Sequence, residues 1–163
     1  MALKADRHEL QTDISFFYGA AVATRGGVVC HDTTAGSGAA MDQGVNKVRY
    51  IATIASSNVP VGILLNDVVN KDLTRTHLNQ HKDEVQLGGK VTVLRKGWVV
   101  TSNITGTPSA GDVAYVGDAG TIMSTAADAA SSGALAIGRF LSSKDEDDYC
   151  KVEVNLPNHG YAN

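Results

Sequence analysis

The sequence predicts an all-β protein, a small antiparallel β-barrel or β-sandwich with an N-terminal arm. Three observations lead to this prediction. Glycine-punctuated apolar runs of strand length recur between residues 90 and 156, and apolar and polar positions alternate at residues 46–54 and 149–156. No long amphipathic helix is available to cover a parallel sheet. A chain of 163 residues is long enough to bury a core without disulfides or metals.

Residues 1–18 are predicted to form the arm, and residues 19–163 a single β domain. The first 13 residues are polar and charged and show no apolar period, and Phe16, Phe17 and Tyr18 follow soon after them. These aromatics either anchor the first strand in the core or dock on a neighbouring chain, as aromatic side chains often do at interfaces. All three are therefore candidate partner-binding residues.

The first half of the domain is expected to hold short strands and glycine turns. Residues 20–24 and 28–31 predict a hairpin around Gly26 and Gly27, because paired glycines permit the positive φ of tight turns. The alternating residues 46–54 predict a half-buried strand. The continuous apolar residues 61–65 predict a strand that is covered on both faces.

Residues 70–84 are the most polar internal stretch, compatible with a short helix or an open excursion. A loop of this length in a compact domain is usually functional or docked on a partner. His77 and His81 have the spacing of zinc ligands on a helix, but Leu78 stands where a zinc protease needs glutamate. We interpret both histidines as solvated loop residues and as candidate partner contacts.

The second half of the domain gives the strongest strand signal. Hairpins are expected around turns at 95–97 and 118–120, followed by strands at 134–141 and 149–156, with Cys150 pointing inward. The acidic run 145–148 should connect the last two strands. It lacks the alternating acids and central glycine of a calcium-binding loop, so weak surface binding of a cation is left open.

No catalytic, cofactor or metal site is predicted. Gly36 and Gly38 begin a dinucleotide-like pattern that Met41 breaks, and Ser109 lacks the first glycine of a nucleophile elbow. Trp98 suits either a core position or a sugar-stacking platform.

The charge pattern predicts neither a nucleic-acid nor a membrane partner. Basic residues are scattered in a chain of net charge −3, and no apolar run is long enough to span a bilayer. Charged residues stand near the N-terminus where a signal peptide would have its apolar core, which predicts synthesis in a cytoplasm.

The order of motifs in the C-terminal half resembles that of head decoration (cement) proteins of tailed bacteriophages. The resemblance covers residues 61–156 and consists mostly of turn and core residues. The motifs are Lys90-Val-Thr-Val-Leu, Lys96-Gly-Trp-Val-Val, Ala110-Gly-Asp-Val-Ala-Tyr-Val, Ala119-Gly-Thr-Ile, Ala136-Ile-Gly-Arg-Phe-Leu and Val152-Glu-Val-Asn-Leu.

The resemblance implies a non-enzymatic virion protein, made in the host cytoplasm, on the outer surface of an expanded capsid. It would bind the major capsid protein and bridge neighbouring capsid subunits, commonly through an N-terminal arm and as a homo-oligomer, often a trimer. The polar stretch 70–84 is longer than the family pattern suggests.

Two other functions stay open at this point. A receptor- or carbohydrate-binding module of a tail or fibre would need exposed aromatics, and the sequence can supply few. A small trimeric nucleotide hydrolase of the dUTPase type has a similar size and β content. The C-terminal residues 156–163 lack the glycine-rich tail of that enzyme.

Overall fold

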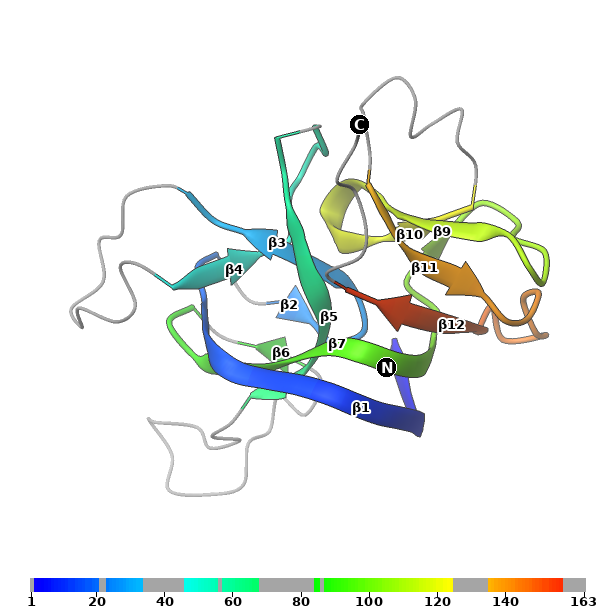
Figure 1. Cartoon of the computed structure of the whole chain (residues 1–163), viewed down its shortest axis with the longest axis horizontal. Coiled ribbons are helices and arrows are strands. Elements are labelled where there is room, and N and C mark those ends of the chain that lie inside the picture. The colour runs from blue at the N-terminus through cyan, green and yellow to red at the C-terminus, as the bar shows by residue number, and fades with distance from the viewer. Residues whose placement is uncertain are drawn as a thin grey trace.

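The computed structural model of the protein describes residues 2–20, 23–33, 46–55, 57–67, 84–85, 87–124 and 135–156. They form one ten-stranded and one two-stranded sheet (Figure 1), which confirms the predicted all-β fold. No helix within these ranges has the length and hydropathy needed to cross a membrane. The elements are β1 (Leu3–Tyr18), β2 (Ala23–Thr24), β3 (Val28–His31), β4 (Lys47–Arg49), β5 (Pro60–Asp67), β6 (Glu84–Val85), β7 (Lys90–Thr101), β8 (Ile104–Thr105), β9 (Val113–Val116), the short 3-10 turn η1 (Asp118–Gly120), β10 (Ile122–Met123), β11 (Ala136–Phe140) and β12 (Cys150–Asn155).

Five strands of the large sheet close into a ring. β1 pairs with β4, β4 with β3, β3 with β5, β5 with β7, and β7 pairs again with β1. Only the contact between β1 and β4 is parallel among these five pairings. Each strand of the ring supplies at least one side chain to a shared buried cluster, whose fully or nearly buried members are Phe16, Tyr18, Ala23, Val29, Val48, Val61, Leu64, Val85, Val91 and Val93.

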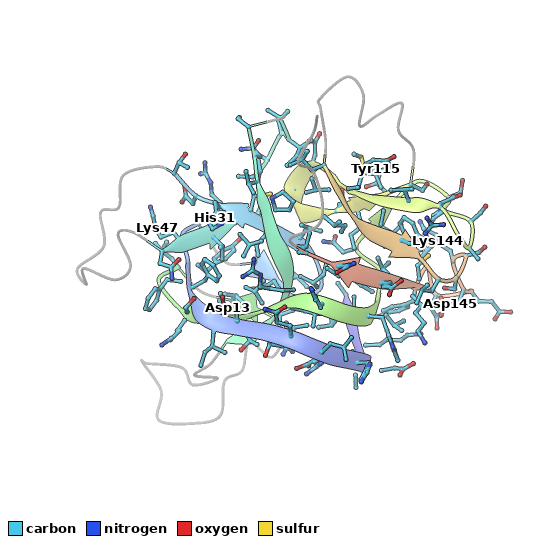
Figure 2. All side chains as sticks on the ribbon, in the orientation of Figure 1. Asp13, His31, Lys47, Tyr115, Lys144 and Asp145 are labelled. Atoms are coloured by element: carbon cyan, nitrogen blue, oxygen red, sulfur yellow. The ribbon has the colours of Figure 1, made fainter. Side chains whose placement is uncertain are left out.

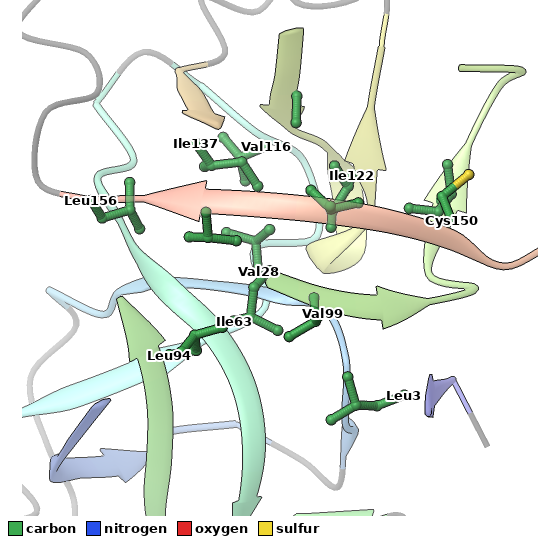
Figure 3. Close-up of a cluster of buried hydrophobic side chains, with 14 of the residues drawn as sticks. Leu3, Val28, Ile63, Leu94, Val99, Val116, Ile122, Ile137, Cys150 and Leu156 are labelled. Atoms are coloured by element: carbon green, nitrogen blue, oxygen red, sulfur yellow. The ribbon is translucent and has the colours of Figure 1, made fainter. Parts of the chain in front are cut away.

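β7 joins this ring to the rest of the sheet. One of its edges pairs with β1 along its length, and the other pairs first with β5 and then with β12. β11, β9, β10 and β8 follow β12 in the sheet. A second apolar cluster lies between this part and the ring, with side chains of both meeting around β12; Leu3, Ile63, Val99, Ile137 and Cys150 are among them (Figure 3).

Several strand predictions are confirmed. Residues 61–65 lie in β5 and are buried, with Ile63 in one cluster and Leu64 in the other, so the strand is covered on both faces. β12 alternates as predicted, and Cys150 is fully buried. β9 and β10 form the predicted hairpin around η1, in which Ala119 has a φ of 53°.

The predicted turn at residues 95–97 is wrong. Residues 90–101 form one continuous strand, β7. Gly97 has a φ of 139° and lies against the main-chain oxygen of His8 on β1. The glycine is needed because another strand crosses close to this backbone. In a sequence, a glycine required by such a close approach cannot be distinguished from a glycine required by a turn.

The predicted pairing of residues 20–24 with 28–31 is also wrong. β2 pairs with β6, and β3 pairs with β4 and β5. The strand expected at 46–54 ends at Arg49, and the backbone then bends away from the sheet. Ile54 is nevertheless buried, and its backbone N–H donates a hydrogen bond of 2.7 Å to the Asp118 carboxylate at η1.

Candidate docking site on the N-terminal strand

Two of the three candidate aromatics lie in the protein's own core. Phe16 is 7% exposed and Tyr18 is 3% exposed. Phe16 meets the His31 ring edge-on at a centroid distance of 5.7 Å, and Tyr18 meets Tyr50 in the same way at 6.0 Å. These two side chains therefore fix the end of β1 to β3 and to the segment that follows β4.

Phe17 differs from its two neighbours because it points to the other side of β1. Its ring is partly exposed, and the Lys90 ammonium lies 5.9 Å from the ring centroid. Of the three aromatics, Phe17 alone presents a sizeable surface to a partner. His77 and His81 lie outside the described residues, as does most of the polar stretch 70–84.

The predicted arm is extended, and its middle part is exposed on both faces. Residues 3–18 form β1, and every residue from Ala5 to Thr12 is exposed. Two large apolar side chains of this strand lie in solvent, Leu10 with 70% and Ile14 with 52% of its surface exposed. This part of β1 is attached mainly by its main-chain pairing with β7.

Contacts at the start of β1 hold the exposed segment in place. Leu3 is 5% exposed and belongs to the second apolar cluster. The Lys4 ammonium lies 3.1 Å from the Asp145 carboxylate and 4.0 Å from the centre of the Tyr149 ring. Lys4 and Asp145 are 141 residues apart, so nothing in the sequence pointed to this contact.

Asp145 also organises the acidic run in which it lies. Its carboxylate accepts hydrogen bonds from the backbone N–H groups of Asp147 at 3.0 Å and Tyr149 at 2.8 Å. The bond from Tyr149, with help from Lys4, lowers the pKa of Asp145. The run connects β11 and β12, as predicted. Figure 2 shows Asp145 and Lys144 together at this end of the molecule.

Trp98 is neither a core residue nor an open platform. It is half-buried on β7, and the Lys151 ammonium covers its ring at 3.5 Å from the centroid. His8 of β1 approaches the same ring at a centroid distance of 6.4 Å. Because a cation and a second ring already occupy its surroundings, sugar stacking on Trp98 is disfavoured.

A buried charge cluster lies at the other end of the ring. The side chain of Asp32 is 1% exposed, and its oxygens lie 3.5 Å from Lys47 Nζ and 3.5 Å from Arg49 Nε. Figure 2 shows Lys47 close to His31, far from Asp145. The cluster joins the end of β3 to β4 and compensates the buried carboxylate, which is a structural arrangement.

The side chains in the described ranges are not placed for metal binding or thiol chemistry. No three His, Cys, Asp or Glu side chains there are grouped to hold a metal ion. Cys30 and Cys150 are fully buried, and burial raises the pKa of the Cys30 thiol to about 12. A neutral, inaccessible thiol is a poor nucleophile.

The comparison with family models gives one match. It is described as a structural cement protein (E217 gp24/Pam3 gp6), and it covers residues 13–155, from the last third of β1 to the end of β12. A search of curated proteins found no match. The matched range is most of the 163 residues, so the chain belongs to the phage structural cement protein family and is a structural component of phage capsids.

Proposed function

We propose that this cement protein decorates the outer surface of the phage head, binds the major capsid protein and stabilises the shell by bridging neighbouring capsid subunits. The observation that carries the proposal is the family match over residues 13–155, which takes in every strand of both sheets except the first part of β1. The role needs no catalytic group, and we propose that the protein is not an enzyme.

The architecture suits a protein that must resist mechanical force at its contact with the shell. β1, which provides the proposed contact with the shell, is a member of a closed ring and not a freely hanging extension. Force applied at Phe17 is therefore distributed through main-chain hydrogen bonds from β1 to β7, and from β7 to β12. A subunit that contacts several capsid proteins also gains avidity, because each further contact is intramolecular after the first.

The contact residues that we propose are Phe17, His77 and His81, with Phe16 and Tyr18 holding the strand that presents Phe17. Phe17 offers a partly exposed ring next to the Lys90 ammonium. The net charge of −3 supports a partner other than nucleic acid, because a protein that lines packaged DNA needs a basic face. We also propose that the protein acts as a homo-oligomer on the shell.

The stoichiometry of purified virus particles tests the proposal. Quantitative mass spectrometry should give a copy number comparable to that of the major capsid protein. Particles that lack the protein should release their DNA at a lower temperature, and adding the purified protein should restore the wild-type temperature. A few copies per particle, or none, would contradict a cement role.

A further inference from the structure

β1 has one edge without a partner strand over most of its length. Its inner edge pairs with β7, but β4 reaches its other edge only at Phe17 and Tyr18. The Asn46 side chain donates a hydrogen bond of 2.6 Å to the Ser15 oxygen and closes the ladder there. In the part of the chain that the structure describes, no strand pairs with this edge between Lys4 and Ile14. Figure 1 shows β1 at the border of the sheet.

This edge is long, and apolar side chains are exposed along it. Sheet edges are kept from pairing with another chain by short length, proline, charged side chains or bulges, and β1 has only the last two of these. β1 has 16 residues and no proline, and its exposed residues include Leu10 and Ile14. Its main-chain N–H and C=O groups therefore form a template to which a further strand can be added.

The charges along this edge favour an antiparallel over a parallel pair of two copies. Lys4, Asp6, Arg7 and Glu9 precede Leu10, and Asp13 follows it. In an in-register parallel pair each of these charges meets its like. In an antiparallel pair centred on Leu10, Arg7 lies opposite Asp13, and no two like charges lie opposite each other.

The pairing of β1 with β7 is irregular at Leu10, and this position is a natural centre for such a pair. Glu9 lies opposite Gly97 and Gln11 lies opposite Lys96, so that Leu10 has no opposite residue on β7. A two-fold axis at Leu10 would place Arg7 of one copy opposite Asp13 of the other and would bring the two leucines together. Arg7 now bonds Glu9 in its own chain, and Asp13 lies 3.9 Å from Arg95.

We propose that β1 pairs antiparallel with β1 of a second copy, about a two-fold axis at Leu10, and so joins the large sheets of two subunits. The partner is a second copy because Arg7 of each strand then lies opposite Asp13 of the other, and the two exposed Leu10 side chains cover each other. The assembly formed through this edge is a dimer. This departs from the trimer that the family resemblance implies.

The oligomeric state of the full-length protein tests the proposal. Sedimentation equilibrium should show a dimer at micromolar concentration. Leu10→Lys should abolish the dimer, because it places two ammonium groups opposite each other at the axis. Its melting temperature at a concentration where both proteins are monomeric should equal that of the wild type, since Leu10 is 70% exposed. A wild-type monomer, a trimer, or a dimer that survives Leu10→Lys would overturn the proposal.

A cysteine variant tests the axis itself. Opposite residues of an antiparallel pair have Cα atoms about 4.5–5.5 Å apart, which suits a disulfide. Leu10→Cys should form a disulfide-linked dimer under mild oxidation. Leu87→Cys is the matched control, because Leu87 is 69% exposed and lies next to Gly88, which bonds Tyr18 at the far end of β1. The native cysteines are fully buried and do not compete. Equal cross-linking of both variants would overturn the proposal.

Discussion

Gly97 of β7 lies directly against the main-chain oxygen of His8 on β1, so closely that a Cβ atom at position 97 would collide with it. At this point the register between the two strands shifts, and Trp98 comes next on β7. The absence of a side chain at Gly97 therefore allows β1 to lie along the whole of β7. Gly97 therefore contributes to the attachment of the exposed middle part of the N-terminal strand.

Gly97→Ala should destabilise the protein by at least about 2 kcal/mol, because the new methyl group adds a steric collision to an unfavourable φ of 139°. Gly106→Ala is the matched control. Gly106 has a φ of 82°, and a methyl group added there would meet no atom within 4 Å. This variant should therefore lose only about 1 kcal/mol through backbone strain. Urea denaturation measures both. Equal losses of stability in the two variants would show that the close approach of His8 to Gly97 adds nothing to the cost of the substitution.

Phe16→Ala and Phe17→Ala should separate folding from docking. Phe16 is 7% exposed, and its loss should reduce the free energy of unfolding by about 3 kcal/mol or more. Phe17 is partly exposed, so its loss should change stability by less than about 1 kcal/mol. Phe17→Ala should still weaken binding to capsids that lack the protein, as measured by co-sedimentation. Wild-type binding by Phe17→Ala would remove Phe17 from the proposed contact.

Tyr50→Phe should reduce the free energy of unfolding by about 1–3 kcal/mol. The Tyr50 hydroxyl donates a hydrogen bond of 2.6 Å to the Thr24 oxygen and accepts one of 3.1 Å from the Gly27 N–H. The variant leaves both backbone groups without this partner. Tyr115→Phe serves as the control, because Tyr115 is partly exposed on β9. Thermal denaturation of the three proteins should rank Tyr50→Phe as the least stable.

Stability should fall as the pH rises above about 9. Burial raises the pKa of the Cys30 thiol to about 12 from an ordinary value of 9.0. Between these two pH values the unfolded chain releases a proton that the folded chain keeps, so rising pH favours unfolding. This one thiol is expected to lower the free energy of unfolding by about 2 kcal/mol by pH ~10.5.

Urea denaturation of wild type and Cys30→Ala at several pH values measures this slope. The variant is expected to be less stable at neutral pH and to show a shallower decline above pH ~9. Burial also raises the pKa of Cys150, so part of the decline should remain. Parallel curves for the two proteins would contradict the assignment to Cys30.

The sequence predicted the elements whose signals are local. The Asp118-Ala119-Gly120 turn between β9 and β10 needs only a few neighbouring residues, and the alternation in β12 reflects burial on one face. Gly97 shows the limit of such reasoning. A glycine shows that a side chain does not fit, but the obstacle is His8, some ninety residues earlier in the chain.

Some features of the candidate site are likewise visible in the sequence, and others depend on the fold. The three aromatics at 16–18 stand out in the sequence, but which of them faces the core depends on the pairing of β1 with β7. The contact of Lys4 with Asp145 and Tyr149 depends on the fold of the whole chain. The lack of an apolar period in the first 13 residues is visible in the sequence, and exposure of β1 on both faces is its structural counterpart.

The ring also sets the order in which the protein can be completed during synthesis. Leu3 pairs with Thr101, so β1 cannot complete its pairing until β7 has been translated and has left the exit tunnel of the ribosome. Until then β1 lacks its longest pairing, and closure of so long a loop is slow. The charges spaced along β1 thus also protect the nascent chain from aggregation.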